Sequence, residues 1–336
     1  MFKLNTPSAG PDTIMGVTYS QFFPPAPTLT EVNVPRQDRR VFIVSGGASG
    51  VGLELCRFLY HAGGKVYIAG RSAQNAQVAI TRIKAEKLDV PQDGAPGELA
   101  FLQVALDDLS TVKSAAERFT AAETRLDVLF NNAGVSNPPK GSLSPQGHEL
   151  TMATNCLGPY LLTQLLLPML QQTARAASPG SVRVVWTASV AVEFAQTPDG
   201  TFANPALVPQ RDYEKSKVGN WFLAAALAKQ SLDILSVVQN PGNLKTQIVR
   251  HFSSIVPLMA APLLYHAKYG AYTELWAGLS DDLTLENNGS YVVPWGRLHP
   301  APRADMAGPV KELLENDSGV AADFRDFCDA ATVKYR

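Results

Sequence analysis

The stretch Tyr213-Glu214-Lys215-Ser216-Lys217 contains the residue types with the clearest chemistry in this sequence. Tyr213 and Lys217 lie four positions apart, so on a helix both side chains leave the same face, one turn apart. A neighbouring ammonium favours the phenolate and lowers the pKa of a tyrosine from its usual value of about 10. Such a phenol could donate and accept a proton near neutral pH. The alternative is that the two residues form a surface pair on an amphipathic helix. The catalytic interpretation requires that the rest of the chain supply a cofactor site and a second hydrogen-bond donor.

A glycine-rich turn, Ser45-Gly46-Gly47-Ala48-Ser49-Gly50-Val51-Gly52, follows the apolar run 41–44. Glycines between a strand and a helix allow a tight turn and a close approach to a pyrophosphate, which binds at the helix N-terminus. The spacing of Gly46, Gly50 and Gly52 differs from the usual GxGxxG. The turn therefore predicts a dinucleotide site that includes Ser49 and Val51 beside the three glycines.

The residues after the second expected strand, 65–69, indicate which dinucleotide binds. Enzymes that use NAD place an acid there for the ribose 2′-hydroxyl, whereas a nearby arginine accommodates the 2′-phosphate of NADP. Here the chain reads Ala69-Gly70-Arg71-Ser72, with no acid. A guanidinium suits a phosphate, so the sequence predicts NADP(H) held by Arg71. The alternative is a solvated arginine.

Polar residues follow two later strands and interrupt one helix. Asn131-Asn132-Ala133-Gly134 closes the strand 127–130, and Ser189 follows the strand 182–186. Asn155 lies inside a long apolar helix, where a buried amide needs a partner. Ligands of parallel sheets bind at the carboxyl ends of the strands, so these residues are expected at one edge. Taken singly, each is also explained by capping or turn formation.

The elements that must position these residues alternate regularly between strand and helix. Short apolar runs at 41–44, 65–69, 99–104, 127–130, 182–186 and 234–239 alternate with helical segments. This pattern predicts an α/β protein with a Rossmann-type, doubly wound parallel sheet of seven strands and helices on both faces. A long helix over 148–177 is expected to bend at Pro159 and Pro168.

Two segments stand outside the alternation. Residues 1–38 are rich in proline and predict an extended arm, with a disordered tail as the alternative; residues 39–336 are expected to form a single domain. The stretch 252–282 is apolar and aromatic. It fits a helical lid over an apolar substrate and an extra pair of core helices equally well.

Composition excludes several classes of function. Apolar residues make up 46% and charged residues 18% of the 336, which suits a globular protein with a large core. A net charge of −1 gives no reason to expect nucleic-acid binding. The three separated cysteines indicate free thiols in a reducing compartment, so a cytoplasmic protein is expected. We expect no metal site, because no HxxxH or HExxH grouping is present, and no membrane span.

In combination, the motifs resemble the short-chain dehydrogenase/reductase family of the classical type. The match covers about residues 39–250, and the similarity is greatest to the branch of retinol dehydrogenases, the WW-domain oxidoreductase and fungal relatives. The residues that carry it occur in the family's order: Gly46, Gly50, Gly52, Asn132, Ala133, Gly134, Asn155, Ser189, Tyr213, Lys217, Pro241, Gly242 and Thr246.

The resemblance implies a role for each matching residue. Tyr213 would exchange the proton with the substrate oxygen, Lys217 would lower its pKa and hold the nicotinamide ribose, and Ser189 would hydrogen-bond the substrate. Asn155 would support a water-mediated proton relay. Asn132 would lie near the adenosine side, and Ala133 and Gly134 would also contact the cofactor. Thr246, after Pro241-Gly242, would contact the carboxamide.

Three features depart from the family pattern. An acid–leucine pair that would touch adenine is replaced by Ala105-Leu106, with Asp107 or Asp108 as substitutes. Ala188 stands where the first of two serines is usual. Extra residues at 197–210 are expected to shape the substrate mouth.

The predicted function is therefore an NADP(H)-dependent oxidoreductase that interconverts a carbonyl and an alcohol on a bulky apolar small molecule, as a step in secondary-metabolite biosynthesis. A non-redox or regulatory NADP-binding protein of the same fold is the alternative. A serine hydrolase is disfavoured because no GxSxG elbow is present. The resemblance further implies a homodimer through the helices 148–177 and 211–232, unless the terminal extensions cover that surface.

Overall fold

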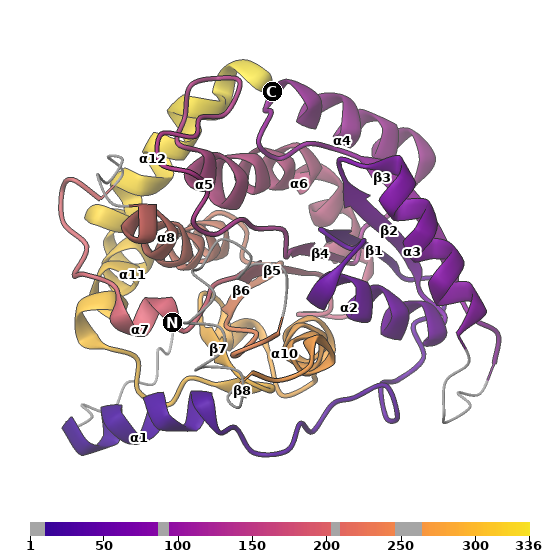
Figure 1. The fold of residues 1–336 in the computed structure, drawn as a ribbon, viewed down its shortest axis with the longest axis horizontal. Coiled ribbons are helices and arrows are strands. Elements are labelled where there is room, and N and C mark those ends of the chain that lie inside the picture. The colour runs from indigo at the N-terminus through magenta and orange to yellow at the C-terminus, as the bar shows by residue number, and fades with distance from the viewer. Residues whose placement is uncertain (1–10, 87–93, 203–208, 246–263) are drawn as a thin grey trace.

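A computed structural model describes residues 11–86, 94–202, 209–245 and 264–336 of the chain. These residues form a central eight-stranded sheet with the order β3-β2-β1-β4-β5-β6-β7-β8 (Figure 1). All neighbouring strands are parallel except β7 and β8. The strands are β1 (Val41–Ser45), β2 (Lys65–Gly70), β3 (Glu98–Gln103), β4 (Val128–Asn131), β5 (Arg183–Thr187), β6 (Leu235–Gln239), β7 (Tyr291–Val293) and β8 (Arg297–Leu298).

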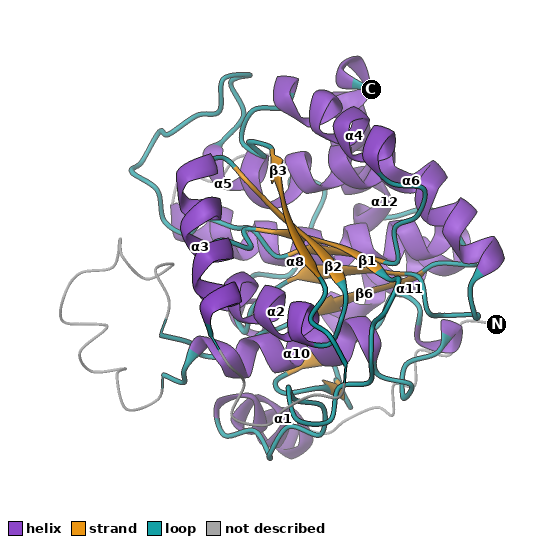
Figure 2. Ribbon diagram, turned by 90° about the vertical axis from the view of Figure 1, so that its right-hand side faces the viewer, coloured by secondary structure: helices purple, strands orange, loops and turns teal. Residues whose placement is uncertain are grey.

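Helices cover both faces of the sheet (Figure 2). One face packs against α2 (Gly50–His61), α3 (Ala73–Ala85) and α10 (Ala267–Leu279). The other packs against α4 (Ser110–Ala122), α6 (Gly158–Ala176) and α8 (Pro209–Gln230). Successive side chains of β1 divide between the two cores: Phe42 and Val44 enter one and Ile43 the other. Because both faces are buried, the strand reads as a continuous apolar run.

The predicted fold class is confirmed, with one difference in the strand count. Seven strands were expected, and the eighth is the two-residue strand β8, which pairs antiparallel to β7. A strand of two residues leaves too short an alternation to be recognised in the sequence.

The predicted long helix 148–177 is interrupted. It consists of α5 (Leu150–Met152), a π-helical turn at Ala153–Leu157, and α6. Such a turn inserts one residue into a helix and often marks a functional position. Here it contains Asn155, one of the predicted site residues.

The N-terminal arm is not simply extended, because residues 11–22 form helix α1 (Pro11–Phe22), which lies at the edge of the molecule near β8 (Figure 1). In the stretch 252–282, residues 252–263 lie outside the described residues. Helix α10 is a core helix in which every residue from Gly270 to Leu279 is buried. For this part of the stretch the prediction of a lid is therefore wrong, and the alternative of a core helix agrees with the structure. Lids and core helices have the same apolar composition, so the sequence alone does not distinguish one from the other.

The C-terminal helices α11 (Ala304–Asn316) and α12 (Val320–Thr332) pack on α8 and extend the core on that face. As a result, every residue from Ser216 to Ala228 of α8 is buried within the one chain. The expectation of a dimer face on this part of α8 is therefore wrong, and the terminal extension covers that surface.

Candidate active site

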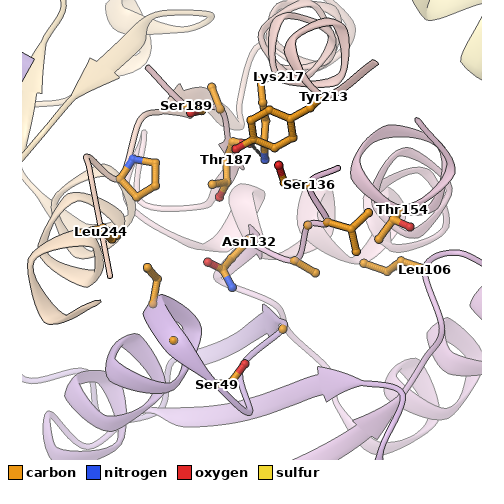
Figure 3. Close-up of a pocket in the computed structure, with 18 of the residues that line it drawn as sticks. Ser49, Leu106, Asn132, Ser136, Thr154, Thr187, Ser189, Tyr213, Lys217 and Leu244 are labelled. Atoms are coloured by element: carbon orange, nitrogen blue, oxygen red, sulfur yellow. Dashed lines mark hydrogen bonds between the residues drawn. The ribbon is translucent and has the colours of Figure 1, made fainter. Parts of the chain in front are cut away.

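A cavity of about 680 Å³ opens at the carboxyl ends of β1 and β4, on either side of the point where the strand order reverses. This is the position at which open α/β sheets bind their ligands. Its wall includes the glycine-rich turn, the residues after β4 and β5, and the start of α8 (Figure 3). Pockets of this size suit a dinucleotide or a drug-sized molecule.

The glycine-rich turn depends on backbone shapes and spaces that other residues would not fit. Gly46 has φ +69° and Gly50 φ +57°, in the left-handed region that favours glycine. A Cβ on Gly52 would lie 2.7 Å from both the Asn132 Nδ2 and the Gly46 carbonyl oxygen. Asn132 donates from the same Nδ2 to the Ser45 carbonyl at 2.7 Å. The side chain of Asn132 thus ties β4 to the turn after β1.

The N-terminus of α2 fits a phosphate group. Ser49 precedes the helix but its side chain makes no capping hydrogen bond. The first N–H groups of a helix have no partner within the helix, so here they remain available at the cavity wall. Gly46, Ser49, Gly50 and Val51 all line the cavity. This arrangement fits the pyrophosphate of a dinucleotide.

Arg71 lies at the cavity, where its guanidinium pairs with Asp107 at 3.1 Å. The arginine side chain is 66% exposed, so the pair is accessible to solvent and to a ligand. Of the two acids considered as substitutes at the adenine side, Asp107 reaches the cavity. Asp108 instead accepts hydrogen bonds from Ser110 and Gln146.

Tyr213 and Lys217 project from one face of α8 into the cavity, as the four-residue spacing predicts (Figure 3). The Lys217 Nζ lies 5.6 Å from the centre of the Tyr213 ring. Lys217 is 2% exposed, and its Nζ donates to the Thr187 carbonyl at 2.9 Å. Burial lowers the pKa of Lys217 to about 8, so the ammonium is the main form at neutral pH.

Ser189 follows β5 and lies beside Tyr213 at the cavity wall (Figure 3). Its carbonyl accepts a hydrogen bond from the Tyr291 hydroxyl at 3.0 Å, which fixes the loop. Burial raises the pKa of Tyr213, while a hydrogen bond with Ser189 opposes the rise. The expected lowering of this pKa by Lys217 is therefore not found: the dominant influence is desolvation, which residue spacing does not reveal.

Asn155 lies just behind the cavity wall. Its Oδ1 accepts from the Val135 N–H at 2.8 Å, and its Nδ2 donates to the Val135 carbonyl and to the Ser216 hydroxyl at 2.9 Å. A Cβ on Gly134 would lie 3.2 Å from the Asn155 Oδ1 and 3.4 Å from the Lys217 Nζ. The amide therefore connects the strand-end loop 134–135 with α8.

The structure brings most of the predicted site residues to one cavity. Those that line it are Gly46, Ser49, Gly50, Val51, Arg71, Asn132, Ala133, Gly134, Ser189, Tyr213, Lys217, Pro241 and Gly242. Gly52 and Asn155 lie behind the wall. Thr246 and part of the extra segment 197–210 lie outside the described residues.

Sequence reasoning missed a buried network below the lysine. Thr187 donates to Glu274 at 2.9 Å, and the Gln239 Nε2 donates to the Thr187 hydroxyl at 2.9 Å and to Glu274 at 2.8 Å. The usable signal was Glu274 itself, the only charged residue in the largely apolar run 269–279.

The N-terminal helix also reaches the loops of the site. Gln21 is 1% exposed, donates to Glu193 at 3.0 Å, and accepts from the Asn240 amide at 2.8 Å. Glu193 lies in α7 (Ala191–Phe194), shortly after Ser189, and Asn240 directly precedes Pro241. One arm residue thus joins α7 to the segment after β6, each of which is next to residues that line the cavity.

We expect Gln21→Ala to lower the free energy of unfolding by about 1–3 kcal/mol, because it leaves buried polar partners unsatisfied. Urea denaturation measures the change. Val32→Ala, an exposed change in the same arm, is the control and should have an effect of at most about 0.5 kcal/mol. Equal stability of Gln21→Ala and the wild type would show that the arm does not hold these loops.

No helix in the described ranges is long and apolar enough to cross a bilayer. Within the same ranges, no three His, Cys, Asp or Glu side chains are grouped so that they could hold a metal ion.

Comparisons with known proteins agree with this geometry. The family model described as short chain dehydrogenase matches residues 40–254. A short-chain dehydrogenase/reductase of Pestalotiopsis fici is 42% identical over 326 residues, covering 94% of this chain and 98% of the relative. One of Neocamarosporium betae is 40% identical, covering 96% of this chain and 94% of the relative.

Solved structures share the fold at lower identity. A protein from Mycobacterium paratuberculosis superimposes with a TM-score of 0.65 at 23% identity, covering 91% of this chain and 97% of that one. The NADP complex of RhlG from Pseudomonas aeruginosa gives a TM-score of 0.59 at 23% identity, covering 77% of this chain and 95% of that chain.

Proposed function

The chain belongs to the short-chain dehydrogenase/reductase family and is an oxidoreductase, and from that premise we propose that it interconverts a carbonyl and an alcohol with NADP(H). The observation that carries the proposal is the shared cavity. Tyr213, Ser189 and Lys217 face the same space as the glycine-rich turn that fits a dinucleotide. A proton donor, a second hydroxyl and a cation therefore meet beside the expected cofactor.

We assign the proton transfer to Tyr213. In the direction of reduction, its hydroxyl protonates the substrate oxygen; in the direction of oxidation, the phenolate removes the alcohol proton. Because burial raises the pKa of Tyr213, the protonated form predominates at neutral pH, which suits reduction. Ser189 holds the substrate oxygen by a second hydrogen bond and orients the carbonyl toward the phenol.

Lys217 stabilises negative charge on the phenol and, in this proposal, holds the nicotinamide ribose. Asn155 binds the loop 134–135 and the Ser216 hydroxyl of α8, and thereby helps to position the neighbouring Lys217. Bound NADP(H) supplies or accepts the hydride, and the residues of the chain supply the proton and the orientation. Pro241 and Gly242, which line the cavity, would border the nicotinamide end, with Thr246 proposed for the carboxamide.

The preference for NADP(H) rests on Arg71 and gives a direct prediction. We expect Arg71→Gln to weaken NADP+ binding by about 10–100-fold, the value of one or two charge-assisted hydrogen bonds to a phosphate. Binding of NAD+ should change little, since it lacks the 2′-phosphate. Titration of tryptophan fluorescence or calorimetry measures both constants.

Arg82→Gln is the matched control. Arg82 is an exposed arginine of α3 that pairs with Glu86 and does not line the cavity, so its loss should leave both affinities unchanged. If Arg71→Gln weakened NAD+ and NADP+ equally, Arg71 would not be the residue that recognises the 2′-phosphate.

The substrate is proposed to be bulky and apolar. Beyond the residues already assigned, the cavity wall contains Pro138, Pro139, Leu150, Leu244 and Leu264. The similarity to fungal relatives supports a step in secondary-metabolite biosynthesis as part of this proposal. The three buried, free cysteines support a reducing, cytoplasmic location.

The function is tested by a screen of ketones, aldehydes and alcohols with NADPH and NADP+, following the absorbance of the reduced nicotinamide. Turnover of an apolar carbonyl supports the proposal. A protein that binds NADP(H) tightly but turns over none of them would favour the second candidate, a regulatory NADP-binding protein of the same fold.

A further inference from the structure

A carboxyl group is buried directly behind the proposed catalytic lysine. Glu274 lies on α10 and is 0% exposed. Its Oε1 accepts hydrogen bonds from the Thr187 hydroxyl at 2.9 Å and from the Gln239 amide at 2.8 Å. Its Oε2 is buried without a hydrogen-bond partner among the described residues. An acid in such a place is costly and needs a reason.

Thr187 joins this acid to Lys217. Its hydroxyl contacts Glu274, and its carbonyl oxygen accepts from the Lys217 Nζ at 2.9 Å and from the Asn220 amide at 2.8 Å. In the described part of the chain, that carbonyl is the only hydrogen-bond partner of the Lys217 Nζ. The ammonium and the carboxyl are therefore held by the same residue at the end of β5.

Few other ionisable groups act on the pair. Lys217 faces Cys156 of the π-helical turn and Tyr213 of its own helix, and burial raises the pKa of both groups, so they are neutral at pH 7. On the other elements that pack against α10, Arg183 of β5 binds the carbonyls of Ala277 and Ser280, and in α2 Glu54 pairs with Arg57. Of the acids named here, Glu274 is therefore the one that ionises in the range in which Lys217 titrates, and its charge then favours the ammonium.

We propose that Glu274 is a positioning residue that holds the Lys217 ammonium at the cavity wall through Thr187 and, where its own carboxyl group is ionised, favours the charged form of the lysine. The inference rests on the proposed role of Lys217 in catalysis. It adds Glu274 of α10 to that site. This residue does not line the cavity, so it would contact neither substrate nor cofactor.

The two groups titrate in the same range. Burial lowers the pKa of Lys217 to about 8 and raises that of Glu274 to about 8, so Glu274 is mainly protonated at pH 7 and gains its charge in the range in which Lys217 loses its proton. Where both groups are ionised, each charge favours the other. Such groups lose their protons as a coupled pair. Replacing Glu274 with a neutral side chain removes the attraction and leaves desolvation unopposed, so the ammonium should be lost at lower pH.

The test compares Glu274→Gln with Thr273→Val in the full-length protein without cofactor. Thr273 is the neighbouring residue of α10, 0% exposed, with a hydroxyl that has no partner among the described residues, so its change probes packing without altering charge. The pH dependence of Lys217 acetylation by acetic anhydride, followed by peptide mass spectrometry, reports the pKa of Lys217. We expect this pKa to fall by about one unit in Glu274→Gln and to remain unchanged in Thr273→Val.

A second variant covers the case in which Glu274→Gln does not fold. Thr187→Val removes the hydroxyl that binds Glu274 but keeps the carbonyl that binds Lys217, and it should lower the same pKa by a smaller amount. An unchanged pKa of Lys217 in a folded Glu274→Gln protein, or an equal fall in Thr273→Val, would overturn the proposal.

Activity provides an independent readout. In the wild type, turnover should fall as Lys217 loses its proton above about pH 8, and this alkaline limb should move to lower pH in Glu274→Gln. A wild type without any oxidoreductase activity would reject the proposed function. The acetylation result would still decide whether Glu274 controls the protonation of Lys217.

Discussion

Tyr213→Phe should reduce kcat by about 10²–10⁴-fold, the usual contribution of a positioned general acid or base. The change removes one oxygen atom, and the ring keeps its place on α8. The hydroxyl shares the cavity with Ser189 and Lys217, and no other tyrosine of the described residues lines it. Affinity for NADPH should remain close to that of the wild type, because the loss concerns the transition state alone.

Steady-state kinetics with the best carbonyl substrate measure the effect, and fluorescence titration measures cofactor binding. Tyr67→Phe is the matched control: this phenol of β2 donates to Glu123 and does not line the cavity. It should leave kcat unchanged. If Tyr213→Phe kept wild-type turnover, the proton would have to come from another group, and the regulatory alternative would gain support.

Lys217→Met should cost about 10²–10³-fold in kcat/KM, comparable to the loss of one preorganised electrostatic contact in an active site. Methionine has a similar length and fills the buried space without the charge. Both kcat and the affinity for the cofactor should suffer, since we assign Lys217 to the phenol and to the ribose. This pattern distinguishes it from Tyr213→Phe, for which cofactor binding stays intact.

The same variant should be more stable than the wild type at neutral pH. Lysine has a pKa of about 10.4 in an unfolded chain, whereas burial lowers the pKa of Lys217 to about 8. Between these values the unfolded state binds more protons, so the stability of the wild type rises with pH in that window. Below it, the buried ammonium costs on the order of 3 kcal/mol, which Lys217→Met regains.

Unfolding free energies from urea titrations at pH 7 and at pH 10 check this result. The advantage of Lys217→Met should be largest at pH 7 and shrink toward pH 10. Lys229→Met, on the same helix but bound to the Leu314 carbonyl, is the control and should affect neither activity nor the pH dependence. A less stable Lys217→Met protein would mean that the bond to Thr187 outweighs the desolvation of the charge.

The sequence by itself determined the fold class and most of the residues around the cavity. Strands such as Val41–Ser45 are buried on both faces and therefore read as continuous apolar runs, and the turns that follow them carry the glycines and amides. Since parallel strands end at one edge, residues as distant in sequence as Gly46 and Ser189 could be placed together. The spacing of Tyr213 and Lys217 was sufficient to put both on one face of a helix.

Only the tertiary structure decided what surrounds those residues. The pKa of Tyr213 is set by burial more than by its neighbour Lys217, and burial depends on packing that local sequence does not encode. Glu274, 57 positions after Lys217, reaches it through Thr187 because α10 packs against β5 and β6. Likewise, α11 and α12 cover α8 since their apolar faces need a partner, and a sequence pattern shows such a face without naming what it packs against.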